Sequence, residues 1–429
     1  MEFRSQLIKQ AACVLAAGMV IARAADSVPE EPPPSFWQRD RLTGDWGGWR
    51  PRMLEQGIDF SPVFIGEVMG NVSGGLYGPG AVYDQSLNLP LTLDLEALLG
   101  WPSASVHANA FWIAGNSLTE QCVGDLANVS NISADPSVRL QELWFQQGFY
   151  NATISLRAGL LAADNEFFGA NSATLFINGT FGAFPLVGAN LPNPPIYPMA
   201  APAVRLLLQS DSGCYFQAAA FDGNSGTQDG NPSGTDFPLS KGEGALVFSE
   251  LGFVPPYGRS TNALTGIVKV GAFLLTKRVP DWTDQAAGNY GGGGMNYGLY
   301  GVAEQDLIRS EERVVSVFAR GGYAPPGRNV IDWYVDAGVN FTGLLPGRKY
   351  DVAGIAVARS NFSDDYSLYQ QSIYDTPQFS SEAIVEVTYA AKLAPWWLLQ
   401  PDFQYIVAPG GNSQCRAAVV LGLRTTVIF

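Results

Sequence analysis

The sequence has few of the side chains on which most hydrolases and zinc proteins depend. Among 429 residues there is one histidine, His107, and there are four cysteines. A zinc site needs clustered Cys and His side chains, which this chain does not offer in sequence. Ser-His-Asp or Cys-His catalysis would have to use the single imidazole of His107, so it is also disfavoured. Lysine and arginine total 25 against 39 acidic residues. This acidic balance argues against a nucleic-acid partner, and we expect no catalytic residues, no metal and no cofactor.

Long apolar runs are also missing beyond the N-terminus, although 47% of the residues are hydrophobic. A membrane-spanning helix needs ~20 consecutive apolar residues, and no later stretch approaches that length. The 48 glycines and 28 prolines interrupt the chain too often for a coiled coil or a helical solenoid. The hydrophobic residues must therefore serve many short elements.

The N-terminus has the pattern of a secretory signal peptide. Arg4 and Lys9 precede an apolar stretch over residues 11–22, and Ala22-Arg23-Ala24 is a small-residue cleavage signal. The stretch is too short for a membrane anchor. We expect residues 1–24 to be removed on export, and residues 25–57 to form a Pro-rich linker and an N-terminal periplasmic segment.

Two smaller features follow from export and from turn chemistry. Cys122, Cys214 and Cys415 remain in the exported chain, which allows three alternative single disulfides or none. Pro51 near its start and Gly57 just past its end predict one short helix before the main domain.

The main domain shows an apolar period of two. Between Asp332 and Thr342 one face carries Trp333, Val335, Ala337, Val339 and Phe341, and the other carries Asp332, Tyr334, Asp336, Gly338 and Asn340. A helix would separate these apolar residues, so the pattern indicates a strand. The same alternation recurs over residues 153–160, 268–274, 382–392 and 416–429, with Arg157, Lys269, Glu382, Glu386 and Arg424 on the polar faces.

Alternation of this kind fits a soluble sandwich or an outer-membrane barrel. In the barrel the apolar face meets lipid and the polar face lines a wet lumen. Aromatic residues near the ends of the apolar faces, such as Trp333, Phe341 and Tyr389, favour the barrel, because aromatic rings gather at membrane interfaces. The terminal strand ends in Phe429, which resembles the closing strand of Gram-negative outer-membrane proteins and predicts recognition by the barrel-assembly machinery.

Length then predicts the number of strands. A barrel over residues 58–429, with ~20–25 residues for each strand and its connection, has ~14–18 antiparallel strands, and sixteen is the central value. A barrel of this size is expected to leave an aqueous channel in place of a filled core.

Several motifs resemble the carbohydrate-selective porins, the OprB-type family of Gram-negative outer membranes. The motifs occur in order along residues 40–429: Arg41-Leu42-Thr43-Gly44-Asp45-Trp46-Gly47-Gly48-Trp49-Arg50, Gln141-Glu142-Leu143-Trp144-Phe145-Gln146-Gln147, Gly343-Leu344-Leu345-Pro346-Gly347-Arg348, and Leu399-Gln400-Pro401-Asp402-Phe403-Gln404-Tyr405-Ile406. The resemblance implies a 16-stranded barrel through which small sugars diffuse down their gradient. It also implies lipid and lipopolysaccharide as surroundings, with a monomer and a homotrimer equally open.

A sugar-selective pore needs aromatic faces and hydrogen-bonding side chains. Glu142, Trp144 and Gln146 share the polar face of one strand, which suggests a Trp stacking platform between hydroxyl partners. The alternative for Trp144 is a membrane-interface ring, or a ring packed under an inward-folded loop.

Charged residues nearby suggest a constriction. Arg157 projects to the polar face of its strand, and Asp164 and Glu166 follow after an expected loop. An arginine opposed by carboxylates would create a transverse field that favours neutral dipolar solutes over ions. The alternative is a structural ion pair that satisfies buried charges. The same alternation turns four more residues inward as candidate pore-lining groups: His107, Asn109, Asp336 and Arg424.

Other functions stay open at this point. A secreted all-β carbohydrate-active or carbohydrate-binding protein would also be acidic and aromatic-rich, and could use Asp164 and Glu166 as a carboxylate pair. A general, non-selective porin and a barrel with a blocked pore are two further alternatives.

Overall fold

The computed structural model describes residues 35–237, 242–255, 264–374 and 378–429. The predicted signal peptide over residues 1–24 and most of the Pro-rich linker lie outside the described residues. The division at residues 24 and 57 therefore stays a prediction. Among the described residues, no helix is long and apolar enough to cross a membrane.

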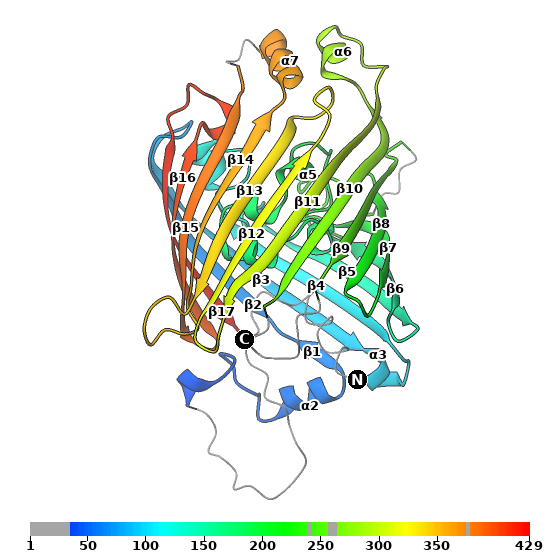
Figure 1. The fold of residues 1–429 in the computed structure, drawn as a ribbon, viewed down its shortest axis with the longest axis vertical. Helices are drawn as coiled ribbons and strands as arrows, with labels where there is room; N and C mark the ends of the chain where they lie inside the picture. Colours follow the sequence, from blue (N-terminus) through cyan, green and yellow to red (C-terminus); the bar gives the residue numbers. More distant parts are fainter. Residues whose placement is uncertain (1–34, 238–241, 256–263, 375–377) are drawn as a thin grey trace, which may run out of the picture.

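Consecutive strands pair antiparallel and close into a barrel (Figure 1). Within the described residues the sheet has 17 strands, of which the short β1 pairs only with β3. The other sixteen, β2 to β17, form a ring, because the last strand pairs with β2 and completes the circle. The strands are β1 Ile58–Phe60, β2 Val63–Ser73, β3 Gly80–Asp94, β4 Ala104–Gly115, β5 Ser137–Phe149, β6 Ile154–Leu161, β7 Ala201–Gln209, β8 Cys214–Asp222, β9 Ala245–Phe253, β10 Gly266–Val279, β11 Gly294–Arg309, β12 Val314–Tyr323, β13 Ile331–Thr342, β14 Val352–Phe362, β15 Ser381–Ala394, β16 Trp397–Val407 and β17 Ala418–Ile428. The predicted fold class and strand number are confirmed.

The two ends of the barrel differ in the length of their connections. Short turns such as residues 150–153, 210–213 and 310–313 lie at one end, and the long connections, including residues 116–136 and 162–200, start from the other (Figure 1). Outer-membrane barrels have short periplasmic turns and longer extracellular loops, so the end with the short turns is periplasmic.

Eleven short helical segments occur in the described part of the chain. The predicted helix before the barrel is α2, which lies at the periplasmic end (Figure 1). The helical segments are η1 Phe36–Gln38, α2 Trp49–Glu55, α3 Leu95–Leu99, η2 Thr119–Val123, η3 Ala163–Asn165, η4 Asn171–Leu175, α4 Gly179–Gly182, α5 Pro185–Gly188, α6 Trp282–Ala286, α7 Asp364–Tyr374 and η5 Pro409–Gly411.

The outer surface carries the apolar half of the alternating pattern. On β13, Val335 is exposed on the outside, whereas Tyr334 and Asp336 are buried on the inside. Leu421 and Leu423 of β17 are likewise exposed, opposite the inward-facing Arg424. Because the apolar residues stand on the outer face and the polar ones on the inner face, the predicted assignment of the two strand faces is confirmed.

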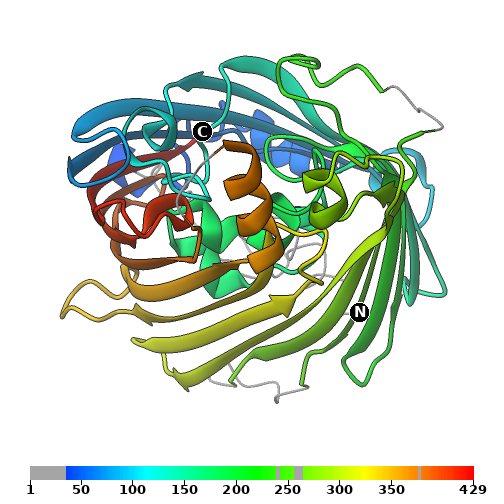
Figure 2. The same ribbon diagram turned by 90° about the horizontal axis from the view of Figure 1, so that it is seen from above.

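The interior is filled more than the sequence suggested. Residues 162–200, here called the inner loop, fold into the barrel and carry η3, η4, α4 and α5, which Figure 2 shows inside the ring of strands. The loop buries aromatic rings against rings of the wall, with centroids 5.1 Å apart for Phe167 and Phe248 and 5.9 Å apart for Phe176 and Phe318. The prediction of an aqueous channel in place of a packed core is therefore wrong for this part of the lumen.

Inward-facing glycines make room for this packing. A Cβ atom at Gly322 of β12 would lie 2.5 Å from Cδ1 of Leu186, and one at Gly354 of β14 would lie 2.6 Å from Cδ2 of Leu175. Any side chain at these two positions would push the inner loop away from the wall. The glycines thus allow the loop to approach the strands closely.

A buried ion pair fixes the inner loop to β12 and β13. The Arg320 Nε atom lies 2.9 Å from the Oδ2 atom of Asp336, and both side chains are fully buried. Arg320 also donates from Nη2 to the carbonyl oxygen of Thr180 at 3.1 Å, and the Tyr334 hydroxyl donates to Asp336 at 2.6 Å. The pair therefore connects the wall to α4.

We expect Arg320→Met to lower the free energy of unfolding by about 3–5 kcal/mol, because it leaves the buried carboxylate of Asp336 without its cation. The double variant Arg320→Met/Asp336→Leu should recover at least half of that loss, since no unpaired charge remains. Unfolding in detergent, followed by the heat-dependent shift in electrophoretic mobility, measures both. Equal stability of the single and double variants would contradict this explanation.

Candidate functional site

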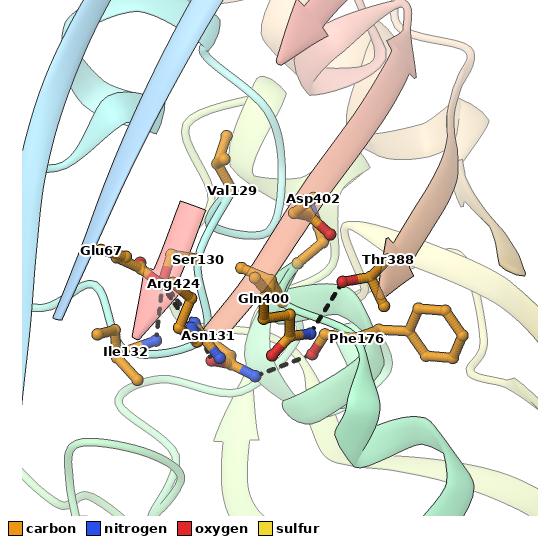
Figure 3. Close-up of polar contacts among 12 residues, drawn as sticks. Glu67, Val129, Ser130, Asn131, Ile132, Phe176, Thr388, Gln400, Asp402 and Arg424 are labelled. Atoms are coloured by element: carbon orange, nitrogen blue, oxygen red, sulfur yellow. Dashed lines mark hydrogen bonds and ion pairs between the residues drawn. The ribbon is translucent and has the colours of Figure 1, made fainter. Parts of the chain in front are cut away.

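The channel is narrowed by two loops that the wall holds from several sides. Residues 116–136, here called the second loop, lie between the wall and the inner loop. The Nη2 atom of Arg424 donates to Asn131 Oδ1 at 2.9 Å, and Asn131 in turn donates to the carbonyl oxygen of Phe176 at 3.1 Å (Figure 3). The main-chain nitrogen of Asn131 also donates to the carbonyl oxygen of Ile177.

Arg424 is thus an anchor for loops. Its Nε atom lies 2.6 Å from Oε2 of Glu67, and the guanidinium stands between Glu67 and Ser130 in Figure 3. Arg424 faces inward as the alternation predicts, but its side chain is buried under the second loop. Asp336 is buried in the same way against Arg320. The prediction that Arg424 and Asp336 line the open pore is therefore wrong, because loops cover both side chains.

A polar cluster lies where the inner loop leaves β6. Glu166 accepts hydrogen bonds from Arg157 and, at 3.1 Å, from Nε of Arg205. Gln146 Oε1 accepts from Arg157 Nη2 at 2.8 Å and from Arg205 Nη2 at 3.1 Å. Strands β5, β6 and β7 lie side by side, so their inward residues Gln146, Arg157 and Arg205 stand in one row facing the loop carboxylate. The structure brings Arg157 and Glu166 together, as the sequence suggested.

Trp144 stands next to this cluster with both ring faces occupied. The His107 ring on β4 stacks on the indole with centroids 4.9 Å apart, and the Arg157 guanidinium carbon lies 3.7 Å from the indole centroid. Since β4 and β6 flank β5, the two neighbours cover opposite faces of the ring. This arrangement leaves no face of Trp144 for a pyranose. The stacking-platform hypothesis is therefore wrong for this geometry, and Trp144 supports Arg157 through a cation–π contact.

Glu142 and Asp164 serve the inner loop. Oε1 of the buried Glu142 accepts from the main-chain nitrogen of Ala162 at 3.1 Å, at the start of the loop. Asp164 Oδ2 accepts from the main-chain nitrogen of Tyr197 at 2.9 Å, which ties the beginning of the loop to its end. Burial raises the pKa of Asp164 to about 6. The hydrogen-bond partners of Glu142 and Asp164 are loop amides. Glu142 is therefore not the hydroxyl partner beside Trp144 that the sequence suggested, and Asp164 does not oppose Arg157.

His107 and Asn109 face inward on β4 and are only half-buried. Nδ1 of His107 lies 2.8 Å from Oγ1 of Thr92, and Asn109 donates to Gln141 Oε1 at 3.3 Å. Their contact with a solute stays a prediction.

Four polar residues near the channel were missed from the sequence. Arg205 was detectable, because Ala201, Ala203 and Arg205 alternate with Val204 and Leu206 by the same period of two. The other three lie on the inner loop and are exposed: Asn165, Asn171 and Thr174. The neighbouring rings Phe167, Phe168 and Phe176 are buried. The loop thus turns amide and hydroxyl groups to the open part of the lumen. Its irregular backbone has no period from which this face could have been read.

Comparison with known proteins places this barrel in a family. The model described as "Carbohydrate-selective porin, OprB family" matches residues 79–429. The chain belongs to the OprB family. It is therefore an outer-membrane porin, which agrees with the closed barrel and its apolar outer face, and the secreted alternative is not supported.

Relatives of this OprB-family chain match over nearly its whole length. It is 27% identical to Porin B of Pseudomonas aeruginosa, with 97% of each chain covered, and 23% identical to the putative porin QuiX of Acinetobacter baylyi, with 92% of this chain and 94% of that protein covered. The high-pH structure of Pseudomonas putida OprB superposes with a TM-score of 0.83 over 92% of this chain and 100% of that chain, at 24% identity. The last comparison shows the fold.

We expect Arg157→Ala to raise single-channel ion conductance roughly twofold, because it removes a cation from the inward face of β6 while Glu166 stays held by Arg205. Planar bilayer recordings measure this. Arg313→Ala removes an exposed arginine from a periplasmic turn and serves as the control. An unchanged conductance in Arg157→Ala would place this residue away from the narrow part of the channel.

Proposed function

We propose that this porin passes small neutral sugars, glucose-like monosaccharides or oligosaccharides, by passive diffusion. The route runs between the exposed side of the inner loop and the wall formed by β3 to β7. Membership of a carbohydrate-selective porin family is the observation that carries the proposal.

The groups along this route suit a sugar. Asn165, Asn171 and Thr174 offer amides and a hydroxyl from the loop, and His107 and Asn109 offer ring and amide nitrogens from β4. Such groups replace the hydration of sugar hydroxyls because each donates or accepts hydrogen bonds. A solute without several hydroxyls would leave these protein groups without hydrogen-bond partners. This supports selection of sugars over apolar solutes of equal size.

The Arg157, Arg205 and Glu166 cluster adds discrimination by charge. Guanidinium and carboxylate groups at one level of the channel create a local field that a neutral, dipolar solute tolerates and an ion does not. The main alternative is a general porin with no preference. The predicted pore-lining roles of Gln146, Arg157 and Glu166 remain part of this proposal.

The partners outside the lumen follow from the outer surface. We further propose that outer-membrane lipid and lipopolysaccharide surround the apolar face, and that the barrel-assembly machinery binds the strand ending at Phe429. Phe429 lies beside β2, with its main-chain nitrogen 3.0 Å from the carbonyl oxygen of Pro62.

Liposome swelling tests the proposed selectivity. We expect glucose and a disaccharide to enter faster than an amino acid of similar size, because only the sugars match the hydroxyl-binding groups along the route. Protein-free liposomes and liposomes with a general porin give the two reference rates. Equal rates for the three solutes would identify a non-selective porin, and no swelling would identify a blocked barrel.

A further inference from the structure

We propose that Glu304 and Lys269 are positioning residues that set the width and the sugar contact of the pore by clamping residues 169–172 of the inner loop. The inference rests on the proposed sugar passage and assigns part of the selectivity to two wall residues that touch the loop backbone. Neither residue was selected by sequence reasoning as a site residue.

The clamp joins three strands to three residues of the loop segment 169–172. Nζ of Lys269 on β10 donates to the carbonyl oxygen of Gly169 at 2.8 Å. Glu304 on β11 accepts from the main-chain nitrogens of Asn171 at 2.7 Å and Ser172 at 3.2 Å, and from the Ser172 hydroxyl at 2.9 Å. Nδ2 of Asn340 on β13 donates to the carbonyl oxygen of Ser172 at 2.7 Å.

The clamped segment is the start of η4, where the loop turns polar groups to the lumen. Asn171 and Thr174 are exposed, whereas Ser172 and Ala173 are buried against the wall. The hydroxyl of Thr174 donates to the carbonyl oxygen of Asn171 at 2.7 Å, which joins the two exposed residues. The position of Glu304 therefore fixes how far both residues stand out from the wall.

The chemistry requires a carboxylate at position 304. A carboxylate accepts several hydrogen bonds at once, and its charge strengthens bonds from the free main-chain nitrogens at a helix start. Glutamine would present an amide group to the same nitrogens, which are donors, and would break at least one contact. Lys269 lies near Glu304 on the adjacent strand and lowers the cost of burying its charge.

Other wall carboxylates hold different parts of the loop. Glu250 accepts from the main-chain nitrogen of Phe168 at 3.2 Å, and Glu386 accepts from those of Ile177 and Asn178 at 2.5 and 3.0 Å. These three loop residues belong to the buried, packed part of the loop. The Glu304 clamp differs because it acts on the segment with exposed Asn171, so its loss alters the channel while the packed core stays in place.

The test measures pore width and sugar affinity separately. Exclusion of neutral polyethylene glycols of graded size from single channels reports width, and block of the ion current by glucose and maltose reports affinity. We expect Glu304→Gln to admit larger polymers and to weaken sugar block at least fivefold. Lys269→Met should change both in the same direction. It also keeps the inference testable if Glu304→Gln fails to show the heat-dependent mobility of a folded barrel.

Asp306→Asn is the matched control. Asp306 faces inward on the same strand, two residues from Glu304, and its carboxylate binds Thr265, Ser316 and Arg309 near the periplasmic end. The substitution Asp306→Asn removes one inward carboxylate and leaves the contacts of Glu304 and Lys269 unchanged. We expect its polymer cut-off and sugar block to stay close to those of the wild type.

A double-mutant cycle with Asn171→Ala completes the test. Asn171→Ala alone should weaken sugar block about fivefold, the value of one hydrogen bond. If Glu304 acts by placing Asn171, sugar block in the double variant Glu304→Gln/Asn171→Ala is as strong as in Glu304→Gln alone. Multiplicative losses, or a polymer cut-off unchanged in Glu304→Gln, would overturn the clamp. A wild-type channel that conducts ions without any sugar block would overturn the proposed sugar passage instead, and the polymer cut-off would still decide the clamp.

Discussion

The structure depends on one constraint, that hydrocarbon offers no hydrogen-bond partner to a peptide group. Antiparallel strands satisfy this only when the sheet closes, as it does where β17 pairs with β2. Closure with this many strands encloses a space wider than side chains alone can fill. The long connections then fold inward, and the lumen becomes a second environment in which backbone groups must find partners.

Side chains of the wall supply those partners, and this explains why so many charged residues face inward without lining a pore. Glu142, Glu250, Glu304 and Glu386 each accept hydrogen bonds from main-chain nitrogens of the inner loop. Arg320 and Gln400 donate to its carbonyl oxygens. An irregular loop has no internal ladder of hydrogen bonds, so the wall takes over the part that a neighbouring strand would play. Polar residues on the inner face of a barrel can therefore indicate a loop bound inside it as well as a water-filled channel.

The sequence predicted those parts of the molecule in which apolar and polar residues alternate regularly. Strands have a period of two, so the two faces of β13 and β17 were predictable from Asp332 to Thr342 and from similar stretches. The strand number came from the chain length. The pairing of Arg157 with Glu166 was also accessible, because the two lie close in the chain. The burial of Asp336 and Arg424 was not, since Thr180 and Asn131, which cover them, are distant in sequence and lie in loops without a pattern. For Trp144 the sequence allowed either a sugar-stacking ring or a packed ring. His107 and Arg157 on the adjacent strands cover its two faces, so the ring is packed.

The place of the inner loop in the chain has a consequence for the order of folding. The loop connects β6 and β7, yet its hydrogen bonds reach β9, β11, β13, β15 and β16, which are all made later in the sequence. Contacts over such separations form slowly, because the intervening chain must be ordered first. The loop can reach its final place only after the C-terminal strands stand around it. The inner loop therefore cannot complete its contacts, and so cannot finish narrowing the lumen, until these later strands are in place.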